Sequence, residues 1–434
     1  MMGLMASEET RTVTSMRIRT SEALPTPEPA TRAWTTRLLI AGIVLTALNL
    51  RPAITSLGAL LEEVRDALGM SGSDAGLLTS VPPLCFAVFG VAAPRLARRL
   101  GPGTVVCAGM VAITAGLIVR PYAGSTAGFL AATALALMGI AVSNVLMPVI
   151  VKRWFPDRVG SMTGLYSMAL ALGTATAAAV TVPMTETVGG SWQTGLAVWA
   201  ALAAVAVLPW IPFVRDRGAS VRDRGASPAA ESHARVDAPA LRITRSRTAW
   251  ALAVYFGLQA TGAYITMGWM AQIFRDSGVH AGAAGLLLAV TMVMGVPLAF
   301  VIPRLATRLP HQGPIVLALG ACGLVGYAGL YLAPASGSWV WAVLLGVSNC
   351  SFPLALTMVG MRARTSAGVA QLSGFAQSTG YLISIPGPLL VGVLYQHSGG
   401  WGLPIGLMAA LMIPQMAVGV LAGRNRTVED EAAR

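Results

Sequence analysis

Carboxylates are missing from the middle of every long apolar stretch of this 434-residue chain. The nearest acids, Glu62, Glu63, Asp74 and Glu186, lie at the ends of such stretches. A carboxylate relay for protons at mid-depth is therefore not evident. Charge is scarce as well: 11% of the residues are charged, against about 25% in soluble proteins. With 55% hydrophobic residues, the chain is not an ordinary soluble domain.

Groups for catalysis or metal binding are also missing. The cysteines Cys85, Cys107, Cys322 and Cys350 stand singly in apolar stretches and form no CxxC pair. No HExxH motif, nucleotide-binding loop or nucleophile–base pair appears. We therefore expect no enzyme, no catalytic residue, no cofactor and no metal site.

Apolar runs of about 20 residues recur along the chain, and the short alternating segments of a β-barrel are absent. This pattern predicts an all-α polytopic membrane protein with 12 transmembrane helices. The expected spans are about 37–60, 74–96, 103–121, 125–150, 160–184, 192–213, 248–273, 281–303, 313–332, 338–360, 368–393 and 401–422.

Polar segments divide the chain into five expected parts. These are a disordered cytoplasmic N-terminus (1–36), an N-terminal six-helix bundle (37–213), a cytoplasmic linker (214–247), a C-terminal six-helix bundle (248–422) and a cytoplasmic tail (423–434). The linker contains two identical heptapeptides, Val214–Ser220 and Val221–Ser227, which we interpret as a duplicated linker unit. No cleavable signal peptide is recognised, and Met16 is an alternative start.

The basic residues predict the orientation. Of the 30 lysines and arginines, 26 fall in segments on one side of the expected spans. By the positive-inside rule, both termini are cytoplasmic in a multi-pass protein of the inner or plasma membrane. Short basic clusters between spans also argue against a nucleic-acid partner. Arg65, Arg120 and Arg275 fall on the opposite side, and Arg51 lies within the first span.

The two halves of the chain repeat each other in order. The matching segments are Ile54–Asp66 with Ile265–Asp276, Ala75–Leu78 with Ala284–Leu287, Pro94–Leu100 with Pro303–Leu309, and Asn144 with Asn349. Six spans in each half give the repeats the same orientation. Two parallel six-helix repeats resemble the major facilitator architecture, whose substrate site lies near the midplane between the bundles.

The loop after the second span resembles the signature of that superfamily, Gly-x-x-x-Asp-Arg-x-Gly-Arg. Here Pro94 replaces the acid and Ala97 the second glycine, so the usual charge relay is not retained. The resemblance implies conformational-switch loops that contain Arg95, Arg98 and Arg99, with Arg304 and Arg308 in the repeat.

Further segments from about residue 37 to 422 are similar to the cyanate permease and nitroimidazole transporter family. They are Asn49–Ala53, Gly76–Thr79, Pro82, Cys85–Phe86, Asn144–Leu146, Pro148, Lys152–Arg153, Phe155–Arg158, Gln259, Tyr264, Trp269, Arg362–Arg364, Leu372–Gly374, Gln377, Gly380–Leu382 and Gly387–Pro388. The resemblance implies a secondary transporter, with cyanate-like anions or small heterocycles as candidate substrates.

Arg51 is the leading candidate for a substrate contact, because a charge at membrane depth usually faces a partner, a cavity or a ligand. Its planar fork suits an oxyanion. A structural arginine satisfied by carbonyls or amides, or one that snorkels to the membrane surface, is the alternative. The other candidates are Asn49, Asn144, Gln259, Tyr264, Trp269, Asn349, Gln377 and Tyr381, with Tyr166 a weaker one. Each could instead join helices, pack, or lie at the interface.

We therefore expect a secondary active transporter of a small anion or small polar compound that works by alternating access. A multidrug or metabolite efflux carrier of the same fold is the alternative, and a non-transporting sensor is a third. The expected partners are the lipid bilayer, a small-molecule substrate and, for uptake, a co-transported proton, with the protein a monomer. Uptake of an anion against an inside-negative potential costs about 2.3 kcal/mol per 100 mV, so uptake without a proton needs exchange or rapid consumption.

Overall fold

The computed structural model describes residues 29–214 and 243–432, and these segments are predominantly helical. The helices are α1 (Pro29–Asn49), α2 (Pro52–Ala59), α3 (Leu61–Leu68), α4 (Gly72–Leu100), α5 (Pro102–Val119), α6 (Thr126–Trp154), α7 (Val159–Thr187), α8 (Trp192–Ala197), α9 (Trp199–Val207), α10 (Ile211–Val214), α13 (Arg247–Asp276), α14 (Ala281–Val293), α15 (Gly295–Arg308), α16 (Gly313–Leu332), α17 (Ser338–Asn349), α18 (Ser351–Met361), α19 (Ser366–Ser384), α20 (Pro386–Ser398), α21 (Gly402–Ala422) and α22 (Val428–Ala432).

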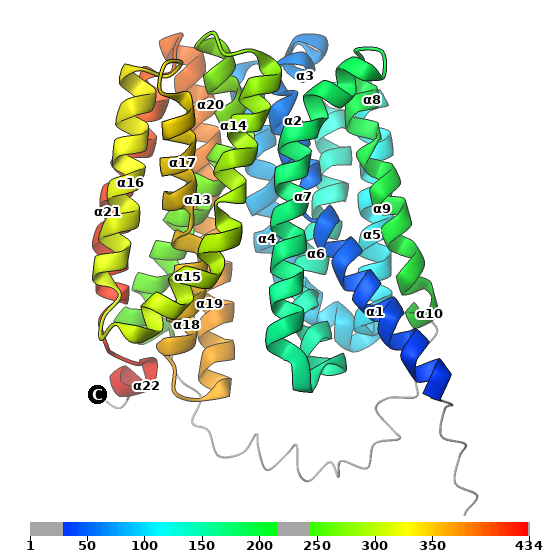
Figure 1. Cartoon of the computed structure of the whole chain (residues 1–434), viewed down its shortest axis with the longest axis vertical. Coiled ribbons are helices and arrows are strands. Elements are labelled where there is room, and N and C mark those ends of the chain that lie inside the picture. The colour runs from blue at the N-terminus through cyan, green and yellow to red at the C-terminus, as the bar shows by residue number, and fades with distance from the viewer. Residues whose placement is uncertain (1–28, 215–242, 433–434) are drawn as a thin grey trace, which may run out of the picture.

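The helices form two halves that stand side by side, α1 to α10 in the N-terminal half and α13 to α22 in the C-terminal half (Figure 1). We call the end where α1 begins and α22 lies the terminal side, and the opposite end, where α3 lies, the α3 side. The first helix begins at Pro29, before the expected start of the first span at residue 37. The N-terminal segment before residue 29 and most of the expected linker, with its repeated heptapeptide, lie outside the described residues.

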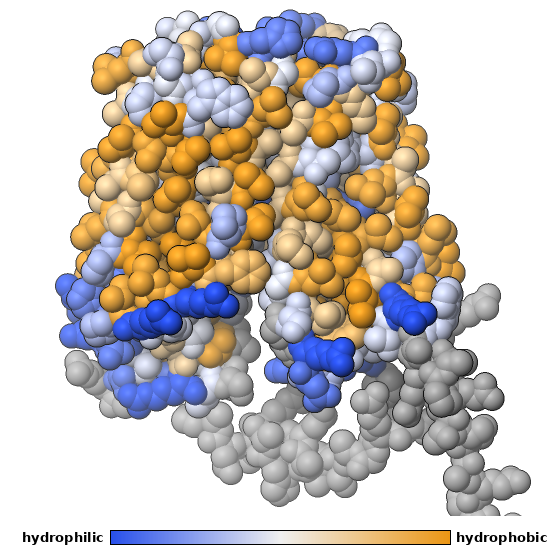
Figure 2. Space-filling view, viewed as in Figure 1, coloured by the Kyte–Doolittle hydropathy of each residue, from blue (hydrophilic) through white to orange (hydrophobic). Residues whose placement is uncertain are grey.

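The predicted polytopic helical fold is confirmed. Within the described ranges, eleven helices are long and apolar enough to cross a membrane, and they match eleven of the expected spans closely. The seventh span is α13, which has 30 residues but a more polar sequence. Polar residues on α13 such as Gln259, Thr261 and Gln272 are buried within the protein. Figure 2 shows an apolar band between two polar ends on the visible face.

Prolines interrupt several spans near their middle. The first span breaks between Asn49 and Pro52, and the tenth breaks at Cys350, between α17 and α18. Proline has no N–H, so it leaves the carbonyl four residues earlier without its helical donor. In α18, Pro353 does this to the carbonyl of Asn349. The breaks therefore place backbone acceptors without helical partners at membrane depth, where only protein or a cavity can satisfy them.

The two halves meet closely toward the α3 side, and glycines allow this approach. A Cβ on Gly58 of α2 would lie 2.1 Å from the carbonyl oxygen of Met267 on α13. A Cβ on Gly76 of α4 would lie 2.8 Å from the carbonyl oxygen of Leu389 on α20. These separations are too short for a larger residue. The glycines thus close the space between the halves on this side.

An ion pair joins the halves at the same end. Arg275, at the end of α13, donates to both carboxylate oxygens of Glu63 at 3.0 Å and lies 2.8 Å from Glu62, both on α3. The bidentate geometry is the stronger form of this contact. The repeat motif that contains Arg275 therefore lies at the contact between the halves on the α3 side.

At the terminal side, the short acidic helix α22 joins two long helices of the C-terminal half. Glu429 accepts hydrogen bonds from the backbone N–H groups of Arg364 and Thr365, where α19 begins. Glu431 accepts from Ser246 at 2.6 Å and from the backbone N–H of Thr248 at 3.1 Å, where α13 begins. Acidic side chains are favourable at helix N-termini. The tail therefore holds the starts of α13 and α19 together.

Arg362 forms a second connection beside the tail. Its side chain is buried and donates to the carbonyls of Ala422 at 2.9 Å and Gly423 at 2.8 Å, and to the side chain of Gln312. Its own carbonyl accepts from the backbone N–H of Val428 in α22. Arg362 thus links the ends of α18 and α21 to the start of α16.

We predict that Glu431→Gln destabilises the protein at neutral pH but not in acid. Burial raises the pKa of Glu431, but hydrogen bonds from Ser246 and Thr248 outweigh it and leave the pKa below its ordinary value. A lowered pKa in the folded state stabilises the fold above the unfolded pKa, and this stabilisation is lost as the pH falls through the folded pKa. Thermal unfolding in detergent should show a loss of about 1 kcal/mol at pH 7 and convergence with the wild type below about pH 4.

Glu186→Gln is the matched control, because Glu186 is an exposed acid at the end of α7. It should unfold like the wild type at both pH values. An equal loss for Glu431→Gln at pH 7 and in acid would contradict the role of the carboxylate charge.

Candidate functional site

A cavity of about 370 Å³ lies between the two halves. Its wall is formed by α7 and Arg51 on the N-terminal side and by α13, α14, α15, α17, α18 and α19 on the C-terminal side. The contacts described above close the space between the halves toward the α3 side. Figure 2 shows a notch between the halves at the terminal side, and the wall extends that way as far as Pro303 and Thr357. The volume is typical of a site for a small molecule.

Arg51 is the only charged side chain among the described residues that line the cavity. It lies in the break between α1 and α2, where its backbone has φ −124° and ψ −28°. None of the ion pairs in the described part of the chain involves Arg51. Its electrostatic neighbours are the side chains of Tyr264, Tyr381 and Tyr166. The cavity therefore holds one positive charge that no carboxylate of the described segments neutralises.

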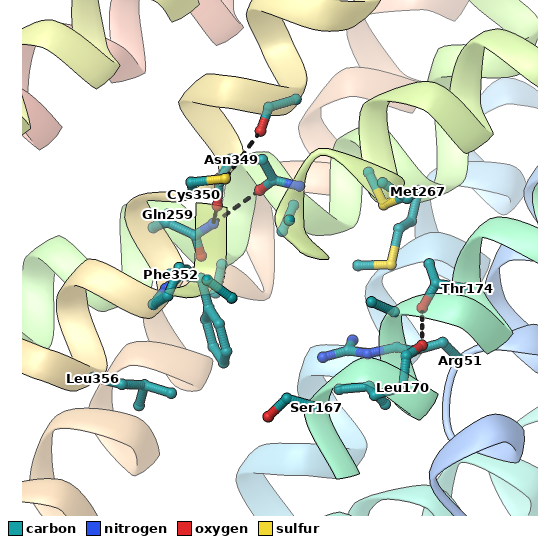
Figure 3. Close-up of a pocket in the computed structure, with 18 of the residues that line it drawn as sticks. Arg51, Ser167, Leu170, Thr174, Gln259, Met267, Asn349, Cys350, Phe352 and Leu356 are labelled. Atoms are coloured by element: carbon teal, nitrogen blue, oxygen red, sulfur yellow. Dashed lines mark hydrogen bonds between the residues drawn. The ribbon is translucent and has the colours of Figure 1, made fainter. Parts of the chain in front are cut away.

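Two amides lie across the pocket from Arg51 (Figure 3). The Nε2 of Gln259 donates to the backbone carbonyl of Asn349 at 3.1 Å and to its Oδ1 at 2.9 Å. The first acceptor is the carbonyl that Pro353 leaves without a helical donor. Gln259 on α13 therefore stabilises the break between α17 and α18 and fixes the position of the Asn349 side chain.

Aromatic rings close the inner end of the cavity. Tyr264 and Tyr381 line it from the C-terminal half, and Phe86 of α4 stacks on Tyr381 with ring centroids 5.0 Å apart. Phe86 also lies 6.4 Å from the ring of Tyr264. Tyr264 borders a much smaller cavity with Gly58 and Thr79 as well. The rings therefore separate the main cavity from the closed α3 side.

Of the nine predicted contact residues, the structure brings five to the cavity wall: Arg51, Gln259, Tyr264, Asn349 and Tyr381. Four others do not line it. Asn49 donates to the carbonyls of Leu45 and Leu202, Asn144 accepts from Tyr166, Trp269 donates to Thr79, and Gln377 donates to Ser373. These four side chains connect neighbouring elements or turns, which is the alternative that the sequence left open for them.

The arginines of the expected switch loops, Arg95, Arg98, Arg99, Arg304 and Arg308, are exposed. They lie at the ends of α4 and α15 on the terminal side. Arg95 donates to the carbonyl of Val91 on its own helix. The ion pairs found within the described residues do not involve these arginines.

Arg120 was counted among the basic residues on the side opposite the termini, and it follows the end of α5. It is fully buried, and its Nη1 donates to the carbonyl of Ala53 on α2 at 2.9 Å. Arg120 therefore supports the segment that follows Arg51. Its place at the end of an apolar span resembles that of a loop arginine, so the sequence pattern does not reveal its contact.

The apolar part of the wall was not predicted. It includes Met267, Met292, Phe352, Leu170 and Leu356. In a chain that is apolar throughout, these residues look like any lipid-facing or core residue. The one available signal is their position on spans that carry polar candidates, since Met267 and Phe352 lie close in sequence to Tyr264 and Asn349.

Comparisons with known proteins agree with this architecture. Residues 39–388 match the family model of the Major Facilitator Superfamily. The chain is 35% identical over 405 residues to the uncharacterized transporter YycB of Bacillus subtilis (strain 168), which covers 93% of this chain and 97% of that protein. It is 31% identical to the 2-nitroimidazole transporter of Escherichia coli (strain K12) over 392 residues, 90% of this chain and 96% of that one.

The cyanate transport protein CynX of Escherichia coli (strain K12) is also 31% identical, over 360 residues that cover 83% of this chain and 90% of that protein. Among solved structures, the nucleoside transporter NupG superposes with a TM-score of 0.68 at 14% identity and covers 88% of this chain and 98% of that chain. At this identity the structural likeness concerns the fold alone.

Proposed function

This chain belongs to the major facilitator superfamily, whose members are multi-pass membrane transporters and not enzymes. We propose that it carries a small anion or a small polar heterocycle by alternating access. One observation carries the substrate proposal. Arg51 lines a cavity between the two halves and has no carboxylate partner among the described residues. An unpaired cation in an apolar environment is costly unless a ligand or water satisfies it.

The chemistry of the wall favours an acceptor-rich substrate. Guanidinium groups bind carboxylate-like and other oxyanions through two parallel hydrogen bonds. Because Arg51 is the only charged residue that lines the wall within the described ranges, an organic cation is disfavoured. Relatives that transport cyanate and 2-nitroimidazole support this range, since both compounds present strong acceptors.

The arrangement of the halves supports alternating access. They meet through Gly58, Gly76 and the Arg275 ion pair toward the α3 side, and a notch lies between them at the terminal side (Figure 2). Because the basic residues gather at the terminal side, we assign that side to the cytoplasm. The conformation is then inward-facing, with the cavity closed to the exterior.

The charges of the cavity bear on which driving force the transport of an anion can use. No carboxylate lines the cavity among the described residues, so a proton coupled to anion uptake has no acidic carrier there. Export of an anion runs with an inside-negative potential, whereas uptake needs exchange, a proton or consumption of the product. The wall also contains flexible side chains such as Met267 and Met292, which adapt to substrates of different shape. An efflux carrier with a broad substrate range is therefore the second candidate.

We predict that Arg51→Ala abolishes saturable transport of cyanate and 2-nitroimidazole in proteoliposomes. Loss of charge-assisted hydrogen bonds should lower transport efficiency by at least about tenfold. Arg51→Lys keeps the charge but not the fork, and it should retain partial activity. Arg424→Ala, at an exposed arginine beyond α21, is the control for substitution as such. Normal saturable transport by Arg51→Ala would exclude the anion site.

We also predict that a link across the α3 side stops transport. The hydroxyl of Ser73 on α4 lies 2.8 Å from Oε1 of Gln396 on α20, so these positions are adjacent across the two halves. A short bifunctional thiol reagent should join Ser73→Cys to Gln396→Cys and hold this side closed. Transport should fall to background in the linked protein, while each variant with only one of the two introduced cysteines keeps its activity after the same treatment. Full transport by the linked protein would contradict alternating access.

A further inference from the structure

The break in the tenth span determines which way the Asn349 side chain presents its amide. Pro353 has no N–H, so the backbone carbonyl of Asn349 needs a donor from elsewhere. Gln259 supplies it through Nε2, at 3.1 Å. A carbonyl can only accept, so the amino group of Gln259 must face it. The orientation of the glutamine amide follows from the backbone.

The same amino group reaches the Asn349 side chain at 2.9 Å and therefore selects its acceptor, Oδ1. The remaining group, Nδ2, carries two hydrogens. It forms no hydrogen bond with any residue that the structure describes. Asn349 is half-buried at the cavity wall, and Figure 3 shows its nitrogen directed away from Gln259. The C-terminal half thus presents a fixed, neutral donor.

We propose that Asn349 Nδ2 is a second recognition point and that the substrate is a small planar ring with two separated acceptor groups. One of them, anionic or strongly accepting, binds Arg51 on the N-terminal half, and the other accepts from Asn349 on the C-terminal half. This inference rests on the proposed function, in which Arg51 contacts the substrate. Gln259 is a positioning residue for Asn349.

The space between the two donors fits a ring better than a small linear ion. The cavity measures about 370 Å³, whereas a water molecule takes about 30 Å³ of liquid. A three-atom ion would therefore fill only a small part of it. Phe352 and Met267 line the same cavity as the two donors, and both side-chain types pack well on a flat ring.

A ligand that contacts both donors also joins the two halves. Its binding free energy then differs between the open and closed arrangements, which is what a substrate needs to shift the conformational equilibrium. An ion bound to Arg51 alone contacts one half, so its binding free energy does not differ in this way between the open and closed arrangements.

The test uses Asn349→Asp, which keeps the shape of the side chain. One carboxylate oxygen still accepts from Gln259, while the group that faces the cavity changes from a neutral donor to an anionic acceptor. The added charge weakens the binding of both carboxylate probes, so the readout is the order of their affinities. The probes are 4-nitrobenzoate, with an acceptor opposite its carboxylate, and 4-aminobenzoate, with a donor there. Thermal stabilisation of the purified full-length protein reports the affinity of each probe.

Wild-type protein should bind 4-nitrobenzoate about tenfold more tightly than 4-aminobenzoate, because a site built to donate rejects a group that cannot accept. It should also bind 4-nitrobenzoate more tightly than cyanate. Asn349→Asp should reverse the preference between the two benzoates. Gln371→Leu, at an exposed glutamine of α19, is the control and should keep the wild-type order.

Equal binding of the two benzoates by the wild type, or an unchanged order in Asn349→Asp, would overturn the proposal. Binding of cyanate without either benzoate would overturn it too, yet leave the proposed function intact. If the aspartate variant does not fold, the order of the three probes on the wild type decides alone. Failure of the proposed function shows separately, as normal transport by Arg51→Ala.

Discussion

The cavity is organised around one guanidinium, that of Arg51, which has no carboxylate partner in the part of the chain that the structure describes. Burial of a charge is expensive, and the side chains of Tyr264, Tyr381 and Tyr166 favour the charged form of Arg51 against this cost. The break at Pro52 allows Arg51 to lie at the wall of a space that can hold water or a ligand. The polar groups of the opposite half are neutral, so the cavity keeps its positive charge.

The backbone breaks connect this electrostatic constraint to the fold. A proline at membrane depth leaves a carbonyl without a donor, and lipid cannot supply one. In the tenth span the donor comes from Gln259 of α13, a helix that is polar for its depth because it lies among other helices. Closure toward the α3 side relies instead on close approaches at glycines and on one bidentate ion pair. The alternating access proposed above requires that this contact separate.

The sequence predicted the fold because membrane depth leaves few options. Run length and basic clusters are enough for the spans, and internal repetition for the architecture. Which residues line the cavity was harder to predict from the sequence. Asn49 and Gln259 are both buried amides within spans, yet only Gln259 lines the cavity. In a helix that is apolar all round, no polar stripe distinguishes one face from another, so the sequence does not indicate which face turns toward the cavity. Arg120 and Phe352 illustrate the same limit, since their contacts depend on how helices rotate and pack.

An experimental structure of the protein saturated with 2-nitroimidazole tests the central claim most directly, because it locates the ligand relative to Arg51. The account predicts the ring in the cavity between the halves, with the nitro oxygens about 3 Å from the guanidinium. A ligand bound elsewhere, with Arg51 contacted only by protein groups, would contradict it.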